Sequence, residues 1–425
     1  MTAVTWDSIS DPDRSSIRSY QRYILMLALL CELFLAADWY AFAAVIPFIS
    51  QTLSLDEQQA GFAQGVFALT YGIGMVVWSP VSRRMPARAM LLIGLAGTGI
   101  GMVLQIFVQS YVELVALRLL IGFFDAAIFI GNMKLIFGWF PQSRRGSIVG
   151  LILAAYSLAI TLDFALGIPL TLATSWRVFF AVLAAGTLIC AGLVALLGRN
   201  NPAEIGLAGF SWGDRSDAHA SLSPREIFSS RWIAIAALGI GACTFAIAGT
   251  ATWVVPGYIA VQKMPVELAP VIGTLMGLSQ VLFLILGGYL SDKLEKTFMI
   301  KLGVVFALVV AILFTLSMTY ETPFTVLVAL AAVSGLAVFG GGAIFALMSE
   351  KYPPSLAPAA VGYAEVCGIV SSFIGPWMMG AIISWQNGSF APAFWAFAGV
   401  EVLFLLGLVA LTRRLPAAAK SISPA

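Results

Sequence analysis

Twelve long apolar runs divide the chain and leave few folds open to it. Each run is long enough to cross about 30 Å of hydrocarbon as an α-helix. Transmembrane barrel strands are shorter and alternate between apolar and polar residues, so a barrel is excluded. We therefore predict an all-α integral membrane protein. Its transmembrane helices are expected at 23–50, 59–81, 89–109, 112–138, 146–172, 177–197, 232–259, 268–291, 298–319, 324–349, 358–384 and 392–412.

Composition agrees with a polytopic membrane protein. Of the 425 residues, 60% are hydrophobic and 10% are charged, whereas soluble domains are about half apolar and a quarter charged. The four cysteines lie in apolar runs and are expected to be buried apolar side chains. The single histidine, His219, has no second histidine or cysteine near it, so we expect no metal site and no cofactor.

Lysine and arginine are distributed unequally over the segments between the runs. If residues 1–22 are a cytoplasmic tail, 19 of these side chains fall on the inner side, whereas Arg177 and Lys263 fall on the outer side. Arg118 and Lys134 lie within a run and complete the set of 23. The positive-inside rule therefore predicts that both termini are cytoplasmic. A cleavable signal is not expected, because the first apolar run is too long for one.

The chain repeats itself once. WFPQSRRGSIVGL, from Trp139, aligns with KYPPSLAPAAVGY, from Lys351, at an offset of 212 residues, and SPVSRR aligns with GGYLSDK at an offset of 209. Two landmarks at nearly equal offsets indicate an internal duplication, which is common in transporters. SPRE, from Ser223 to Glu226, predicts a short capped surface helix. The predicted parts are a tail (1–22), a six-helix bundle (23–198), a cytoplasmic connection (199–231), a second six-helix bundle (232–413) and a tail (414–425).

Twelve runs in a duplicated arrangement, with short basic segments after the second and eighth, resemble the major facilitator superfamily. GYLSDK, from Gly288 to Lys293, resembles the loop signature Gly-x-Leu-x-Asp-Arg/Lys of that superfamily, although the first copy has Arg83 in place of the Asp. The resemblance implies two pseudo-symmetric six-helix bundles that usually work as a monomer. It also implies that the loops act as gates through Gly288, Asp292, Lys293 and Arg84.

The fourth run carries ionisable residues among apolar ones. Seven residues turn a helix by about 700°, so Arg118, Asp125 and Asn132 lie in one line, about 10 Å apart. Asp125 is near mid-span, where a charge that faces lipid costs on the order of 3 kcal/mol or more. The line must therefore face protein or a water-filled cavity. Lys134 is on the opposite face near the end of the run, where it can extend to the membrane surface.

The resemblance gives these residues a role, because the first, fourth, seventh and tenth helices line the cavity in that family. The first run contributes Glu32 and Asp38, and Asp38 is expected at a depth similar to that of Asp125. One acid in each of these helices resembles the proton-coupled sugar and sugar-acid symporters, many of which have an arginine where this chain has Trp39. The chain also contains short motifs that resemble those of organic-anion transporters in the superfamily, namely Trp139-Phe140-Pro141, Ser175-Trp176-Arg177 and Asn201-Pro202.

Asp38 and Asp125 are therefore the predicted proton-coupling residues. Arg118 is expected to pair with Asp38 or Asp163, to bridge through water, or to bind an anionic substrate. The alternative is a fixed network that holds the first bundle together. Substrate contacts are predicted for Arg118, Asn132, Trp39, Trp253, Tyr258 and Gln280, and network roles for Glu32, Asp163 and Glu365. The glycines Gly340–Gly342 either bend their helix or allow close packing.

These observations predict a transporter that moves a small organic solute, most simply an anionic metabolite, together with protons by alternating access. A proton antiporter that exports drugs or metabolites is the alternative, because the same acids serve either direction. An enzyme is not expected, since the spans contain no HExxH and no paired histidines. The expected partners are the small-molecule substrate, protons and the lipid bilayer, without nucleic acid. The expected location is the plasma membrane, in particular a bacterial inner membrane.

Overall fold

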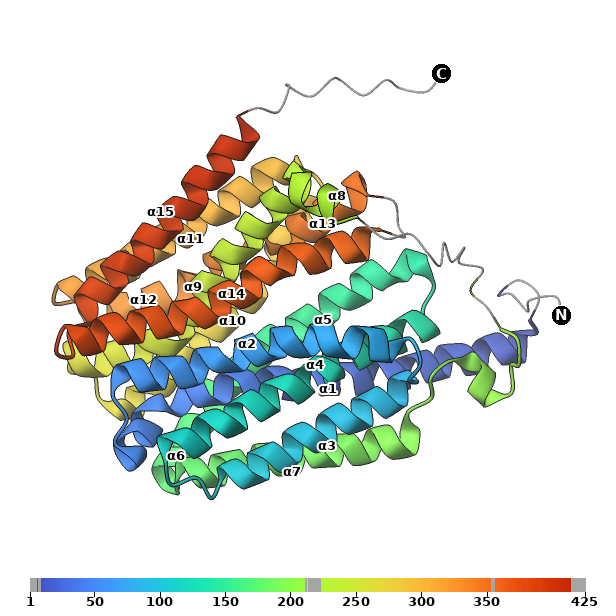
Figure 1. Ribbon diagram of the computed structural model, residues 1–425, viewed down its shortest axis with the longest axis horizontal. Helices are drawn as coiled ribbons and strands as arrows, with labels where there is room; N and C mark the ends of the chain where they lie inside the picture. Colours follow the sequence, from blue (N-terminus) through green and yellow to red (C-terminus); the bar gives the residue numbers. More distant parts are fainter. Residues whose placement is uncertain (1–5, 7–8, 211, 213–222, 353–355, 414–425) are drawn as a thin grey trace.

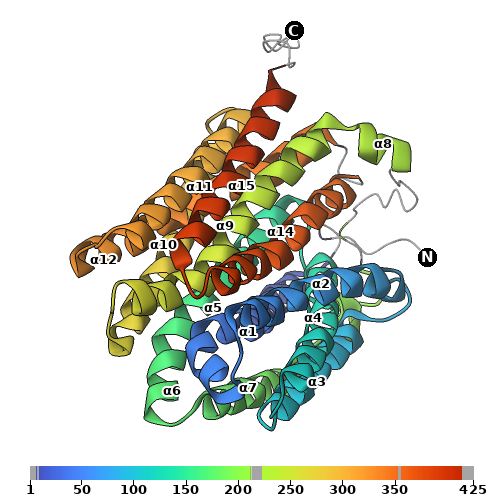
Figure 2. The same cartoon turned by 60° about the vertical axis from the view of Figure 1, so that its left-hand side comes forward.

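The computed structural model describes residues 6, 9–210, 212, 223–352 and 356–413, which form helices joined by short connections (Figure 1). Within these residues, twelve helical stretches are long and apolar enough to span a membrane, which confirms the predicted number. The predicted tail at 414–425 and His219 lie outside the described residues. The first bundle (blue to green) occupies the lower part of Figures 1 and 2, and the second (yellow to red) occupies the upper part.

The first bundle begins before the predicted first span. The helix starts at Asp11 because the Ser10 hydroxyl accepts a hydrogen bond from the Asp13 N–H at 3.3 Å, and Pro12 suits the first turn. The elements of this bundle are α1 (Asp11–Leu53), α2 (Glu57–Ser82), α3 (Ala87–Gln105), α4 (Tyr111–Trp139), α5 (Gln142–Leu162), a π-helical turn (Asp163–Gly167), α6 (Ile168–Ala173) and α7 (Trp176–Leu197).

The second bundle repeats the first. Its elements are α9 (Arg231–Val261), a 3₁₀ turn (Val266–Leu268), α10 (Ala269–Ser291), α11 (Lys296–Thr319), α12 (Phe324–Val333), η5 (Ser334–Val338), α13 (Gly341–Lys351), α14 (Ala357–Trp385) and α15 (Phe390–Thr412). The spans Glu57–Ser82 and Val266–Ser291 each have 26 residues and begin 209 positions apart. This spacing equals one of the two offsets found in the sequence.

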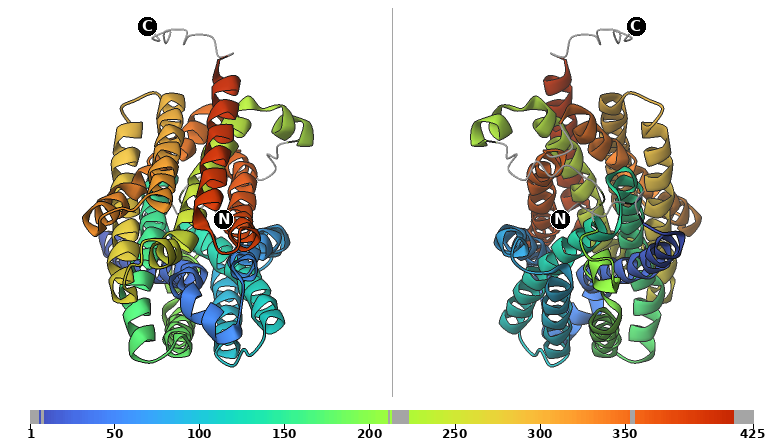
Figure 3. Two further views of the ribbon diagram at one scale, coloured as in Figure 1. Left: turned by 90° about the vertical axis from the view of Figure 1, so that its left-hand side faces the viewer. Right: turned by 90° about the vertical axis from the view of Figure 1, so that its right-hand side faces the viewer.

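The connection between the bundles contains a 3₁₀ turn (Pro202–Ile205) and the short helix α8 (Pro224–Ser229). At its start, the Ser223 hydroxyl accepts from the Glu226 N–H at 3.3 Å, and the Ser223 N–H donates to Glu226 Oε2 at 2.8 Å. These two bonds form a capping box, so the predicted capped helix is confirmed. Figure 3 shows α8 standing away from the bundles at one side.

The tenth span is interrupted, whereas the fourth is continuous. Between α12 and α13 the chain passes through η5, and the Ser279 hydroxyl satisfies main-chain groups there. It donates to the Ala332 carbonyl and accepts from the Gly335 N–H, both at 2.8 Å. After the interruption, a Cβ on Gly340 would meet main-chain atoms of Gly303 in α11. The glycines Gly340–Gly342 therefore lie where the helix type changes and where two helices pack closely.

The two bundles share one apolar core at one side of the molecule. We call the side on which α2 ends and α3 begins the basic side, and the other the opposite side. On the opposite side, Phe42, Phe67 and Phe164 of the first bundle belong to one buried cluster with Trp253 and Phe314 of the second. We call this cluster the shared core. It joins the bundles at the ends of their helices that lie away from the basic side.

On the basic side the described residues form two separate cores. The N-terminal core contains Ile24, Leu91 and Ile136, and its buried members all belong to the first bundle. The C-terminal core contains Ile300 and Ile344, and its buried members all belong to the second. The bundles are thus packed together on the opposite side and are built independently on the basic side.

Glycines allow the close contact between the bundles. On α2, a side chain at Gly61 or Gly65 would meet the main-chain carbonyl of Pro376 or Phe373 on α14. Small residues at such positions let helix backbones approach each other in a membrane. The contact between α2 and α14 is therefore a main-chain contact.

Candidate functional site

A row of buried polar side chains runs through the first bundle between α1 and α4. Arg118, Asp125 and Asn132 on α4 are completely buried, and Glu32 and Asp38 on α1 are each 1% exposed. Of the two predicted surroundings, protein or a water-filled cavity, this face of α4 is turned toward protein in this conformation. Two residues that the sequence analysis did not single out complete what we call the polar row, namely Gln64 on α2 and Thr98 on α3.

Arg118 joins three helices through main-chain oxygens. Its guanidinium donates to the carbonyls of Ala63 at 3.2 Å, Asp38 at 3.1 Å and Trp39 at 3.4 Å. A fourth bond, at 3.2 Å, goes to the side-chain oxygen of Gln64. An arginine offers five N–H donors in a fixed fork, so one side chain can hold α1 and α2 against α4.

Aromatic rings enclose the same guanidinium. Its central carbon lies 4.9 Å from the ring centroid of Phe42 and 4.6 Å from that of Phe67. Such contacts are attractive for a cation removed from water. The predicted pairing with the Asp38 or Asp163 carboxylate is not seen, since the ion pairs of the described residues do not include Arg118. The reason is that Arg118 lies level with the Asp38 main chain, whose carbonyl it binds instead.

The two predicted proton-coupling acids have few partners. Asp125 Oδ1 accepts from the Thr98 hydroxyl at 2.5 Å. Among the described residues, Asp125 Oδ2 and both carboxyl oxygens of Asp38 have no hydrogen-bond partner. Arg118 contacts Asp38, and Asp125 is seven residues farther along α4, about 10 Å along the helix axis. Asn132, a further seven residues along α4, binds Ala28 and Glu32 of the antiparallel helix α1, ten and six residues before Asp38. Since the long Arg118 side chain spans part of the distance to Asp125, this register is compatible with the similar depth predicted for the two acids.

Asn132 closes the row toward the basic side. Its Nδ2 donates to the Ala28 carbonyl at 2.9 Å and to Glu32 Oε2 at 3.3 Å, so it links α4 to α1. Asn132 Oδ1 has no partner among the described residues. A predicted substrate contact and a predicted network acid thus bind each other, and both are hidden from solvent in this conformation.

An aromatic cluster lies beside the polar row at the level where the two bundles separate. The Trp39 ring is 4.9 Å from Phe67 and 5.2 Å from Tyr71, and it stacks on Tyr40 at 6.1 Å. The Tyr156 hydroxyl donates to that of Tyr40 at 3.2 Å. The half-buried rings of Tyr71 and Tyr156 pack against both the shared core and the N-terminal core.

We call Trp39, Tyr40, Tyr71 and Tyr156 the aromatic wall. Only Trp39 was a candidate from the sequence. The sequence does contain a sign of the three tyrosines, because each places a hydroxyl in the middle of an apolar run, where it needs a partner or water.

The candidates in the second bundle are dispersed. Trp253 Nε1 donates to the Pro376 carbonyl at 2.9 Å, within the close contact of α2 with α14. The Tyr258 hydroxyl is 3.1 Å from Ser317 Oγ, inside the second bundle and away from the polar row. Gln280 on α10 is 4% exposed, and Glu365 on α14 is half-buried.

Two further acids lie outside the polar row. Asp163 begins the π-helical turn after α5 and is 2% exposed, and its Oδ2 has no partner among the described residues. The next residue, Phe164, packs where Gly273 of α10 has no side chain, so Asp163 lies near the contact between the bundles. Glu401 on α15 is completely buried, and neither of its oxygens has a partner among the described residues.

The predicted gating loops lie on the basic side. Lys134 on α4 donates to the carbonyls of Ser82 at 2.5 Å and Met85 at 2.7 Å, so it binds the end of α2. In the second copy, Lys296 donates to the Ser291 carbonyl in a similar way. Gly288 packs against Gly342, Lys293 donates to the Tyr289 hydroxyl at 2.5 Å, and Asp292 and Arg84 are exposed.

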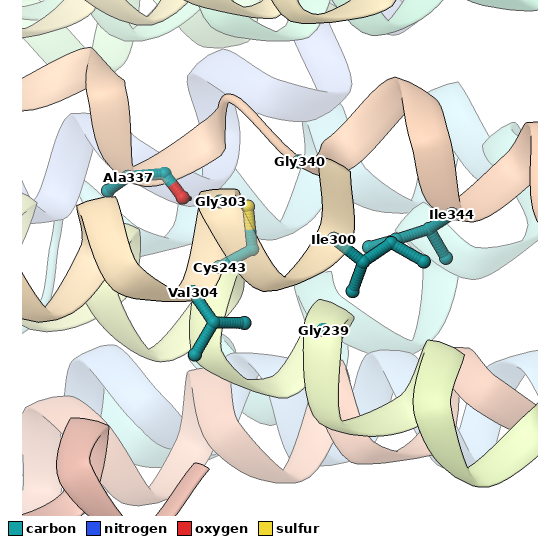
Figure 4. A pocket seen from close by; sticks show the side chains of 8 residues that line it. All are labelled: Gly239, Cys243, Ile300, Gly303, Val304, Ala337, Gly340 and Ile344. Carbon is teal, nitrogen blue, oxygen red and sulfur yellow. Dashed lines mark hydrogen bonds between the residues drawn. The ribbon is translucent and has the colours of Figure 1, made fainter. Parts of the chain in front are cut away.

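A water-sized void marks the interruption of the tenth span. It measures about 10 Å³ and is lined mainly by apolar groups, with Cys243 Sγ donating to the Ala337 carbonyl at 3.2 Å (Figure 4). A space of this size holds at most one water. Among the described residues, no three His, Cys, Asp or Glu side chains gather as a metal site would require.

A family profile and one relative each match most of the chain. The sequence profile described as the Major Facilitator Superfamily matches residues 28–376 and 268–425. The hexuronate transporter of Bacillus subtilis (strain 168) is 24% identical, over 91% of this chain and 94% of that protein. The D-galactonate transporter of Escherichia coli O6:H1 (strain CFT073) is 22% identical over 38% of each chain.

A solved structure shares the fold. A bacterial homologue of the human lysosomal transporter Spinster, in an inward-facing and unoccupied conformation, superposes with a TM-score of 0.71 at 16% identity. The match covers 92% of this chain and 96% of that chain. With two bundles of six helices related by duplication and a profile match over most of its length, the chain belongs to the Major Facilitator Superfamily.

Proposed function

We propose that this protein is a secondary active transporter that moves a small organic anion together with protons by alternating access. The relatives named for hexuronate and D-galactonate transport support a sugar acid or a similar organic anion as the substrate class. The observation that carries the proton-coupled part is the polar row. It places acids with unpartnered oxygens beside one buried arginine.

The distribution of basic residues supports an orientation. If the side with 19 of the 23 lysines and arginines is cytoplasmic, both termini are cytoplasmic. The shared core then lies on the outer side, and the two separate cores lie on the cytoplasmic side. This arrangement is that of an inward-facing transporter, in which the path to the outside is closed by packing between the bundles.

Charge balance supports proton binding. Full ionisation of Glu32, Asp38 and Asp125 beside Arg118 would leave two uncompensated negative charges among completely buried groups. A buried charge without a partner costs several kcal/mol, so at least one of these acids is neutral in this conformation. Asp38 is the acid with the fewest partners, because neither of its oxygens has one among the described residues.

The same balance can couple protons to an anion. When the acids are protonated, the positive charge of Arg118 is no longer compensated and favours an anion nearby. Binding of the anion in turn favours protonation, because such coupling is reciprocal. Arg118 acts through its charge in this scheme, since its donors already bind Ala63, Asp38, Trp39 and Gln64. The aromatic wall supplies the surface against which the carbon skeleton packs.

The test uses purified protein in proteoliposomes with an inward proton gradient and a labelled hexuronate. Asp38→Asn and Asp125→Asn are each expected to abolish accumulation above equilibrium while substrate exchange continues. Exchange needs the alternating conformations but no net proton movement. The matched control is Glu401→Gln, which neutralises a buried and unpartnered acid of the second bundle. Accumulation by this variant is expected to stay within about twofold of the wild type, a factor that corresponds to about 0.4 kcal/mol.

The result that contradicts the proposal is accumulation at the wild-type level in both Asn variants. The exporting antiporter predicted as the alternative is supported by the aromatic wall, which also suits apolar solutes. It is distinguished in the same vesicles, because an inward proton gradient would then drive a preloaded substrate outward.

A further inference from the structure

A cavity on the basic side lies outside the polar row. Its volume is about 550 Å³, and it is formed by Arg18–Leu25 of α1 and by the junction between α4 and α5. The lining residues are Arg18, Gln21, Arg22, Leu25, Phe140, Arg144 and Ile148. This space is large enough for a ligand and lies at the depth where the apolar span of α1 begins.

The mouth of the cavity is positively charged. Arg18 and Arg22 are one turn apart on the same face of α1, and Arg144 faces them from the first turn of α5. Among the lining residues that the structure describes there is no carboxylate. Neither Arg18 nor Arg22 belongs to an ion pair of the described residues, although Arg18 lies over the Trp6 ring at 5.7 Å. Three cations around one space favour an anionic occupant.

The floor of the cavity is apolar. Leu25 and Ile148 lie about one turn deeper than Arg22 and Arg144 on the same helix faces, and Phe140, which follows the end of α4, also lines the cavity. Gln21, a neutral polar residue of the lining, is fixed by a bond from its Nε2 to the Trp139 carbonyl at 2.8 Å. A free inorganic ion would use the arginines but would gain nothing from this floor, whereas an amphiphile would use both.

We propose that this cavity is a binding site for an anionic amphiphile, with a phosphate group at Arg18, Arg22 and Arg144 and an apolar chain over Leu25, Phe140 and Ile148. The occupant that these features favour is an anionic phospholipid of the leaflet on the basic side. Its phosphate would lie at the level where the arginines end the span, and its first methylenes would cover the floor. This site does not depend on the transported substrate, so it stands apart from the proposed function.

The test is native mass spectrometry of the purified protein with added phosphatidylglycerol, with phosphatidylethanolamine as the zwitterionic comparison. The triple variant Arg18→Gln, Arg22→Gln, Arg144→Gln removes three charges from the mouth. Because each basic residue near an anionic headgroup contributes about a fivefold factor, a loss of roughly a hundredfold in phosphatidylglycerol affinity is expected. The matched control removes three charges from exposed positions outside the cavity through Arg83→Gln, Arg84→Gln and Lys293→Gln.

The control is expected to bind phosphatidylglycerol within about threefold of the wild type, since these side chains are not in the lining. Inorganic phosphate is then titrated against the bound lipid. Displacement at millimolar concentration supports recognition of the phosphate group, whereas phosphate binding as tight as the lipid would identify a free-anion site and overturn the lipid assignment. Equal losses in both triple variants, or none in the mouth variant, would overturn the site itself.

Discussion

The two bundles have the same architecture but different interiors. At the offset of 212 residues, Arg118, Asp125 and Asn132 correspond to Leu330, Ala337 and Ile344. The ends of α1 and α9 are 208 residues apart, and at that offset Glu32 and Asp38 correspond to Ile240 and Ala246. Every polar position of α1 and α4 in the polar row is thus apolar in the second bundle.

This difference shows which features of a duplicated membrane protein are constrained. Helix lengths are kept in both halves because the thickness of the hydrocarbon layer requires them. The chemistry of the interior has no such constraint, and here the buried acids and the buried arginine between the first and fourth spans are confined to the first half. Under the proposed function, the proton chemistry would therefore belong to the first bundle.

The largest expected effect concerns the arginine that the second bundle lacks. Arg118→Gln would remove a buried cation and leave several of its acceptors without a donor. Losing one partner of a buried charged interaction typically costs 3–5 kcal/mol, so we expect a loss of about 3 kcal/mol or more in unfolding free energy. The measurement is the unfolding midpoint of the purified protein in detergent.

The matched control is Arg177→Gln. Arg177 also binds main-chain carbonyls, those of Ile106 and Val108, both at 2.9 Å, but it is only partly buried. Its loss is expected to cost about 1 kcal/mol. Equal losses of unfolding free energy in the two variants would mean that the burial of Arg118 adds no stability. The buried arginine would then not distinguish the first bundle from the second in energy.

The next effect concerns a type of contact that occurs within each bundle, in which a glycine of one helix packs against the main chain of another. A Cβ on Gly335 would meet main-chain atoms of Ser279 and Gln280, and one on Gly122 would meet the Phe67 carbonyl. Gly335→Ala and Gly122→Ala are each expected to destabilise the protein by about 1–3 kcal/mol, because a main chain cannot move aside cheaply. Thermal unfolding measures both.

Gly399 on α15 provides the control for these two glycines. It is exposed, and a Cβ there has no neighbour within 4 Å. Gly399→Ala is therefore expected to be neutral or to stabilise by up to about 1 kcal/mol, since alanine suits a helix interior better than glycine. Destabilisation by Gly335→Ala alone would show that only the interrupted tenth span depends on close packing.

The sequence was sufficient to predict the architecture. The twelve spans follow from the lengths of the apolar runs, the duplication from two loop motifs, and the α8 cap from Ser223 and Glu226. These features depend on residues that are close together in the chain or on the thickness of the membrane. That the polar face of α4 avoids lipid was also predictable, because a lipid-facing charge is too costly.

The partners within the site could not be predicted from the sequence. The register of α1 against α4 depends on the bonds that Arg118 and Asn132 make to α1, which the sequence does not give. Pairing with the Asp38 or Asp163 carboxylate was one of the expected roles of Arg118, but three main-chain carbonyls and Gln64 surround it. Periodicity identifies the face that a residue occupies, whereas the atoms opposite that face belong to other helices.

The smallest expected effect concerns the first residues of α3 and α11, which are equivalent helices of the two bundles. Here it is the second bundle that has a polar side chain as the N-cap. Glu295 caps α11 by accepting from the N–H groups of Thr297 at 2.9 Å and Phe298 at 2.5 Å. The equivalent residue before α3 is Pro86, which provides no side-chain cap. Glu295→Ala is expected to lower the unfolding free energy by about 1 kcal/mol, as loss of an N-cap usually does.

The dependence on pH gives this prediction a second measurement. Partial burial raises the pKa of Glu295, but hydrogen bonds from Thr297 and Phe298 outweigh it, so the pKa is lowered overall. A lowered pKa means that the contribution is complete above the unfolded pKa of about 4.3 and is lost as the pH falls through the folded value. The difference between wild type and Glu295→Ala should therefore shrink below about pH 4, whereas Pro86→Ala, which removes no cap, should show no such change. A difference that stays constant down to pH 3 would assign the Glu295 effect to packing instead of charge.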